Sequence, residues 1–100
     1  MLSLGRLSMV DIGRPAYTEG GQLKNISVIL YGRFLLSNKY NTFRKVALTG
    51  ETLAEEEIFE GGGLDAMREG RQSYHREEAR ALSRSCLLKI SLNRYFRMQK

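Results

Sequence analysis

Regularly spaced arginines in the last third of the sequence are the side chains best suited to chemistry with a ligand. Arg76, Arg80 and Arg84 recur every four residues, and Arg94 and Arg97 follow them. On a helix the first three would share one face with Arg94, because successive residues turn by about 100°. Guanidinium groups bind phosphate through paired hydrogen bonds. The spacing therefore predicts a row of phosphate contacts, which Arg97 would extend.

The distribution of charge favours the same class of partner. The chain has 16 basic and 11 acidic residues, for a net charge of +5. Residues 1–63 hold seven of each sign, whereas residues 64–100 hold nine basic and four acidic residues. The basic C-terminal segment 79–100 contains no acidic residue. A one-sided excess of this kind is typical of proteins that meet polyanions.

A second group of basic residues lies in the middle of the chain. Lys39, Arg44 and Lys45 flank an expected turn that also contains Tyr40. A basic hairpin tip with an aromatic ring can grip a single nucleic-acid strand. Two other interpretations stay open, since lysines often protect exposed strand edges from pairing. The five glutamates of residues 51–60 could also neutralise the basic residues within the fold.

The hydrophobic pattern predicts an antiparallel sheet. Residues 26–36 are rich in β-branched and aromatic side chains, and residues 43–49 alternate in the same way after a polar turn. We expect these two stretches to form a hairpin. Gly32 interrupts the first stretch, which indicates a bulge or a close approach of another segment. Residues 7–12 predict a further short strand that ends before Pro15.

Helix formers dominate the region that follows. Thr52 and Glu55 match a capping pattern ahead of a short acidic helix. Residues 64–86 predict the main helix, and residues 87–97 fit a strand or a helical continuation equally well. The expected fold class is α+β, with a small antiparallel sheet (hairpin 26–36/43–49) packed against one main C-terminal helix (about 64–86). The 100 residues predict a single small domain.

Catalytic, metal and cofactor sites are not predicted. His75 is the only histidine and Cys86 the only cysteine, whereas zinc requires three or four ligands. Cys86 is expected on the inward face of the helix, where its thiol would react slowly. A single cysteine suits a reducing compartment, so a cytoplasmic or nuclear protein is expected. The longest apolar run is too short to span a bilayer.

These observations predict a non-enzymatic, basic accessory protein that binds RNA or DNA mainly through phosphate contacts. The predicted contact residues are Arg76, Arg80, Arg84, Arg94, Arg97, Lys39, Arg44 and Lys45. One alternative is a protein–protein adaptor, or a homo-oligomer, that uses the apolar face of the C-terminal helix. The other is peripheral attachment to an anionic membrane by the C-terminal segment.

Overall fold

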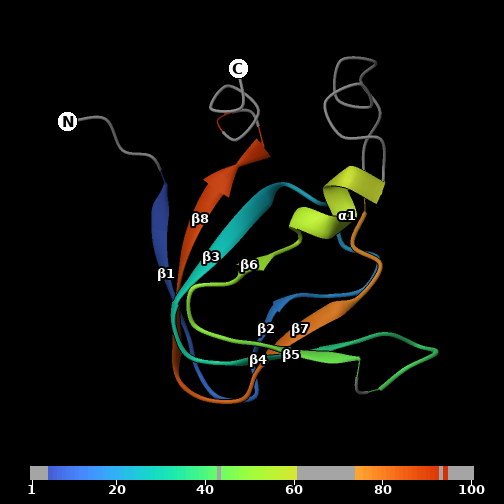
Figure 1. Ribbon diagram of the computed structural model, residues 1–100, viewed down its shortest axis with the longest axis horizontal. Coiled ribbons are helices and arrows are strands. Elements are labelled where there is room, and N and C mark those ends of the chain that lie inside the picture. Colours follow the sequence, from blue (N-terminus) through green and yellow to red (C-terminus); the bar gives the residue numbers. More distant parts are fainter. Residues whose placement is uncertain (1–4, 43, 61–73, 93, 95–100) are drawn as a thin grey trace.

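The part of the chain that the structure describes forms two four-stranded antiparallel sheets with a short helix beside them (Figure 1). The computed structural model describes residues 5–42, 44–60, 74–92 and 94. Within these residues, the strand order of the first sheet is β1 (Arg6–Val10), β8 (Ser85–Ser91), β3 (Asn25–Tyr31) and β6 (Thr52–Leu53). The order of the second sheet is β2 (Pro15–Tyr17), β7 (Glu78–Ala81), β4 (Phe34–Ser37) and β5 (Lys45–Ala47). Helix α1 (Glu55–Glu60) follows β6. The result is a jelly-roll arrangement in which the chain crosses repeatedly between the sheets.

Strands β3 and β8 form the centre of the first sheet. Their register places Ile26 opposite Ile90 and Ile29 next to Leu87. All four side chains are buried. β-Branched and leucine side chains fill such a pleated, covered surface well, which explains why these two stretches form strands. β1 and β6 then pair with the outer edges of this central pair.

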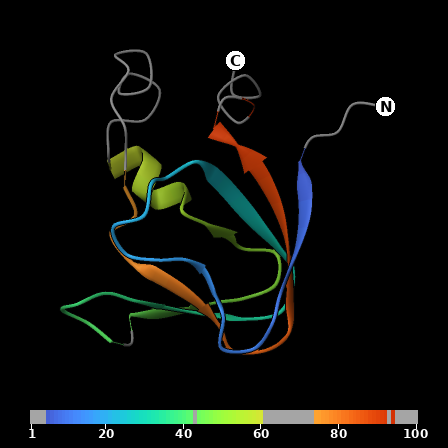
Figure 2. The ribbon, with the colours of Figure 1, turned by 180° about the vertical axis from the view of Figure 1, so that it is seen from behind.

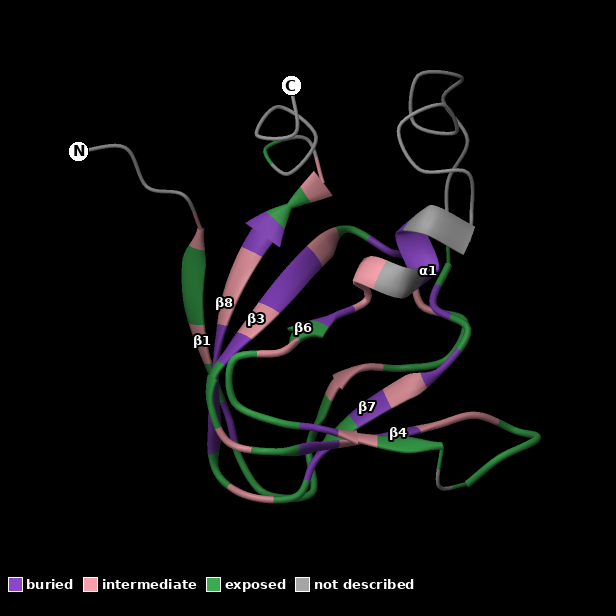
Figure 3. Cartoon of the chain, in the orientation of Figure 1, coloured by how far each residue is buried: buried purple, intermediate pink, exposed green. Residues whose placement is uncertain are grey.

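The main core lies between the two sheets. Both sheets contribute buried apolar side chains to one cluster, as the buried strand segments in Figure 3 show. Phe34 of β4 and Leu53 of β6 are fully buried there, together with Ile29 and Leu87 from the central strands. The second sheet adds Ala79 and Ala81, whose small side chains allow β7 to approach the core closely.

A second, smaller core anchors α1. Ile58 of α1 packs with Leu23, Ile26 and Ile90. Seen from behind, α1 lies beside the start of β3 and above β7 (Figure 2). The helix is therefore fixed on its apolar side to the first sheet. Its other side is left facing the second sheet.

The prediction of a main C-terminal helix at 64–86, and with it the α+β class, is wrong. Tyr74 forms a β-bridge with Gln22, and β7 and the start of β8 follow it, joined by short non-helical segments at 75–77 and 82–84. Residues 64–73 lie outside the described residues. β7 reads Glu-Ala-Arg-Ala, which contains good helix formers, but its alanines alternate inward toward the core. Pairing with β2 and β4 overrides the intrinsic helix propensity.

The predicted hairpin 26–36/43–49 also needs correction. Residues 26–36 form two strands in different sheets, because β3 ends at Tyr31 and β4 begins at Phe34. Only β4 pairs with β5, with Phe34 opposite Ala47 and Leu36 opposite Lys45. β3 pairs instead with β8 and β6. Regular alternation does not show where a chain changes sheet.

The stretch left open at 87–97 is a strand in its described first part, since β8 continues to Ser91. Cys86 is buried on this strand and not on a helix. The short acidic helix expected after residue 54 is present as α1. Thr52 does not cap it, because Thr52 lies in β6.

Gly32 makes the sharp passage between the sheets possible. Its φ angle is +112°, a conformation that side chains other than hydrogen disfavour. A Cβ atom at this position would lie 1.9 Å from Ser85 Oγ and 2.8 Å from Ser85 Cα. Ser85 is completely buried. The close approach that Gly32 indicated in the sequence is therefore confirmed.

Replacement of Gly32 should separate backbone strain from steric overlap. Gly13 also has a positive φ of +82°, but a Cβ there would meet nothing within 4 Å. Gly13→Ala should cost about 1–2 kcal/mol of unfolding free energy through φ alone. Gly32→Ala should cost about 2–4 kcal/mol, because overpacking against Ser85 is added. Urea denaturation of both variants measures the difference, and equal losses would contradict this packing.

Candidate functional site

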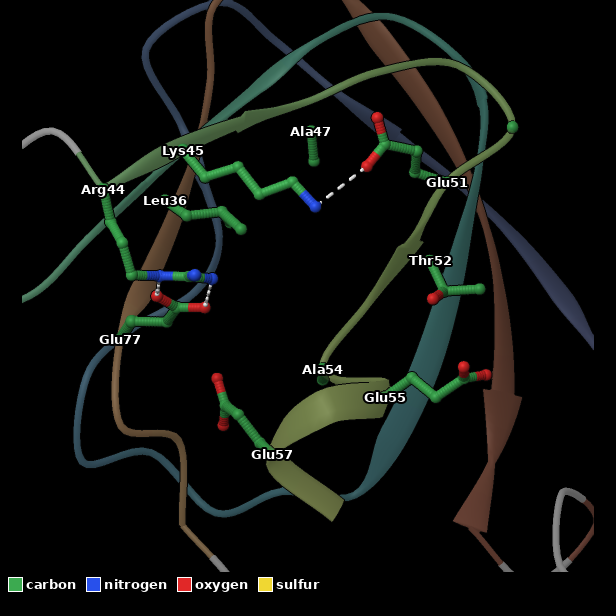
Figure 4. Close-up of a pocket in the computed structure, with 11 residues that line it drawn as sticks. Leu36, Arg44, Lys45, Ala47, Glu51, Thr52, Ala54, Glu55, Glu57 and Glu77 are labelled. Atoms are coloured by element: carbon green, nitrogen blue, oxygen red, sulfur yellow. Dashed lines mark hydrogen bonds and ion pairs between the residues drawn. The ribbon is translucent and has the colours of Figure 1, made fainter. Parts of the chain in front are cut away.

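A cavity of about 330 Å³ opens between α1 and the second sheet (Figure 4). Its volume is at the lower end of the range for small-molecule sites. β4 and β5 supply one wall, and the turn after β5, β6 and α1 supply the opposite one. The side chains around it are mostly charged: Arg44, Lys45, Glu51, Glu55, Glu57 and Glu77.

Two ion pairs involve the basic residues at β5. The Arg44 guanidinium donates two hydrogen bonds to Glu77, from Nε to Oε2 at 2.5 Å and from Nη2 to Oε1 at 2.7 Å. The Glu77 side chain is 11% exposed and that of Arg44 33%. Lys45 Nζ lies 3.2 Å from Glu51 Oε2. Both basic side chains of the cavity are therefore already matched to carboxylates, as the dashed lines in Figure 4 show.

Glu57 is the most enclosed acid of the cavity. Its side chain is only 6% exposed, and its Oε2 atom lies 3.1 Å from His75 Nδ1 and 3.2 Å from the backbone nitrogen of Arg76. The His75 ring stacks on Tyr17, with ring centroids 3.8 Å apart. The backbone of His75 is held by hydrogen bonds to Gly20 and Gly21. These contacts fix one oxygen of Glu57 and leave Oε1, which is buried without a hydrogen-bond partner.

The backbone that presents these acids is strained at one residue. Ala54 connects β6 to α1 with φ at +76°, the only non-glycine residue of the described chain with positive φ. An alanine in this region costs about 1–2 kcal/mol. Ala54 itself lines the cavity. Such strained residues concentrate at ligand-binding sites, where the surrounding packing holds them in place.

The helix that would have aligned the predicted arginine row is replaced, in the described residues, by β7 and its flanking turns. Arg80 lies on β7, where it pairs with Glu78 and donates to the carbonyl oxygen of Gly13. Arg76 and Arg84 are exposed and lie outside regular elements on either side of β7, and Arg94 is exposed after β8. Arg97 lies outside the described residues. A strand and its turns replace the helix that would have aligned these side chains, so the geometric basis of the prediction is lost.

The second predicted group divides in the structure. Lys39 lies exposed in the loop between β4 and β5, with its ammonium 5.0 Å from the centre of the Tyr40 ring. Arg44 and Lys45 instead line the cavity, where each pairs with an acid. One open interpretation was that the glutamates of residues 51–60 neutralise basic residues within the fold. The Lys45–Glu51 ion pair is an instance of this.

Sequence reasoning missed the acids as site residues. The sequence pattern assigns the glutamates of residues 51–60 to a helix cap or to neutralisation of basic residues, and it assigns no role to Glu77. One signal was available: Glu77 and Glu78 are consecutive at the start of an alternating strand, so one of them must turn toward the interior. Their partners come from distant segments, which spacing alone does not reveal.

Metal binding and membrane insertion find no support in the described part of the chain. No group of three or more His, Cys, Asp or Glu side chains there could hold a metal ion. Likewise, none of its helices is long and apolar enough to cross a membrane.

Comparison with known proteins identifies the fold. No family model and no curated protein matches the sequence. The sensor domain of the transcriptional regulator DNR from Pseudomonas aeruginosa matches with a TM-score of 0.70 at 16% identity, over 95% of this chain and 59% of that one. The cAMP-bound PfPKA-R matches with a TM-score of 0.72 at 13% identity, over 93% and 30%. The regulatory subunit of a cAMP-independent protein kinase A from Trypanosoma brucei matches with a TM-score of 0.74 at 14% identity, over 93% and 30%.

These likenesses establish the fold and correct the predicted function. The chain has the same jelly-roll fold as these three structures, and it spans between 30% and 59% of their length. The prediction of a nucleic-acid-binding protein is wrong, because the helix that carried its phosphate contacts is replaced by β7 and β8. The alternatives that relied on the same C-terminal helix lose their basis too.

The Arg44–Glu77 pair should contribute more to stability than an exposed pair of the same type. Arg80 and Glu78 provide the matched control, with side chains 45% and 25% exposed. Double-mutant cycles with Gln at each position should give a coupling of about 1–2 kcal/mol for Arg44–Glu77 and below about 0.5 kcal/mol for Arg80–Glu78. Equal couplings from urea denaturation would show that the enclosed pair is no stronger.

Proposed function

We propose that this chain is a non-enzymatic regulatory domain that binds a small molecule in the cavity between α1 and the second sheet. The observation that carries the proposal is Glu57, a residue of the cavity lining whose carboxylate has one buried oxygen without a hydrogen-bond partner. Buried polar atoms are almost always hydrogen-bonded, and an exception points to a missing partner. A bound ligand supplies that partner.

The position of the cavity supports a regulatory role. α1 contacts the first sheet through Ile58, while its acidic side faces the second sheet across the cavity. A ligand held between them touches two elements whose relative position can change. The strained link at Ala54 gives α1 a point at which the backbone conformation can switch. Occupancy of the cavity is thereby coupled to the position of α1.

The solved structures supply the first ligand class to test. PfPKA-R is described as cAMP-bound, and a Ruegeria pomeroyi protein of this fold as a putative cyclic nucleotide binding protein. The Trypanosoma brucei protein is described as cAMP-independent. The fold therefore does not determine the ligand. The binding of a cyclic mononucleotide has to be compared with the binding of molecules that carry a different charge.

Binding can be located by amide chemical shifts in two-dimensional NMR. The probes are cAMP, adenosine and cadaverine, each titrated into the folded chain. We expect at least one to cause saturable shifts confined to residues around the cavity. Thr52 lines the cavity and is exposed, so Thr52→Tyr should weaken that binding about tenfold by filling the site.

Thr42 provides the matched control, because it is exposed and does not line the cavity. Thr42→Tyr should leave the affinity unchanged. If none of the three probes gives saturable shifts at the cavity, the proposed function is wrong. Equal weakening by both tyrosine substitutions would also count against the cavity as the site.

A further inference from the structure

The chemistry of the cavity wall limits the ligand that it can accept, and this inference rests on the proposed function. The starting point is the free oxygen of Glu57. Its side chain is more than nine-tenths buried, and Figure 4 shows it extending from α1 into the space that faces Arg44 and Glu77. Oε1 has no hydrogen-bond partner, while Oε2 is already satisfied by His75 and the Arg76 backbone. A carboxylate oxygen accepts hydrogen bonds, so the missing group must be a donor.

The sign of the surrounding charge narrows the class further. Four carboxylates and two basic side chains line the cavity, which leaves a net charge of −2. Both basic groups are engaged, Arg44 by two hydrogen bonds to Glu77 and Lys45 by Glu51. An anion entering this space would meet basic groups whose charge the paired acids already offset, within a wall of net negative charge. A cation is instead attracted by the net negative charge of the wall.

A bare metal ion is not the missing donor. Metal ions need several converging ligands, and no suitable group of acidic, His or Cys side chains exists in the described part of the chain. The cavity of about 330 Å³ is also far larger than an ion requires. The positive group must therefore be carried by an organic molecule that fills the remaining space.

We infer that the cavity binds a small organic cation, whose ammonium or guanidinium group donates to Glu57 Oε1. The ammonium or guanidinium group satisfies the buried oxygen and compensates part of the negative charge of the wall. The ion pairs Arg44–Glu77 and Lys45–Glu51 remain closed during binding, since they hold the second sheet's wall in shape. Glu57 is thus the residue that determines specificity for charge.

Three molecules of matched length test this inference on the unmodified protein. Cadaverine carries two ammonium groups, pentanediol carries neutral hydroxyls on the same five-carbon chain, and glutarate carries two carboxylates. NMR titration at low ionic strength should give saturable cavity shifts with cadaverine, about tenfold weaker binding of pentanediol, and no saturable binding of glutarate. Because this series needs no substitution, it stands even if a variant fails to fold.

Substitution of Glu57 then assigns the effect to one side chain. Glu57→Gln keeps the shape but turns an amide donor or an uncharged oxygen toward the cavity. It should weaken cadaverine about tenfold or more, because a charge-assisted hydrogen bond is lost. Glu19→Gln makes the same charge change at an exposed residue away from the cavity. It should leave cadaverine binding within about twofold, since an exposed distant charge is screened.

The outcomes distinguish this inference from the proposed function. Saturable binding of cAMP or glutarate at the cavity, tighter than cadaverine, overturns the cationic ligand while the cavity remains a binding site. Equal affinity of cadaverine for the protein and for Glu57→Gln also overturns it. Absence of cavity binding by every probe, cAMP and adenosine included, removes the proposed function itself.

Discussion

The antiparallel pairing of β3 with β8 is the interaction on which the other parts of the structure depend. It buries Ile26, Ile29, Leu87 and Ile90 and so contributes to both apolar clusters. β1 is attached to β8, and β6 is attached to β3. Because β6 leads directly into α1, this central pair also places the helix opposite the second sheet. The cavity exists only while that placement holds.

Charge in this protein is organised by pairing across the fold. The basic excess looks one-sided along the sequence, yet Arg44, Lys45 and Arg80 each lie against an acid in the structure. Glu77, which precedes β7, pairs with Arg44, which precedes β5. Glu51, in the turn after β5, pairs with Lys45 of β5. The acids offset the charge of these three basic groups locally. This pairing leaves Glu57 as the buried acid with unused hydrogen-bonding capacity.

Local features could be predicted from the sequence, whereas the topology could not. The close approach at Gly32 is indicated by the glycine itself. The short acidic helix is indicated by the pattern of residues 52–60. Both features depend only on residues that are near in the sequence. β7 was mistaken for helix because Glu-Ala-Arg-Ala has high helix propensity, and only pairing with β4 and β2 makes it a strand. The break between β3 and β4 was missed because both halves share the same apolar pattern. The site could not be predicted, because Glu57 and His75 are far apart in the sequence and become neighbours only through the tertiary fold.

The pairing of β1 with β8 has a consequence for how the chain is made. β1 is the first described strand to leave the ribosome, and its partner β8 is the last. The first sheet therefore cannot close during synthesis of the segments between them, and Ile29 and Phe34 stay uncovered until β8 emerges. Unpaired apolar strands of this kind are prone to join other chains. Nascent copies of this protein thus expose these apolar strands until β8 emerges, and translation pauses before β8 should lower the yield of folded protein.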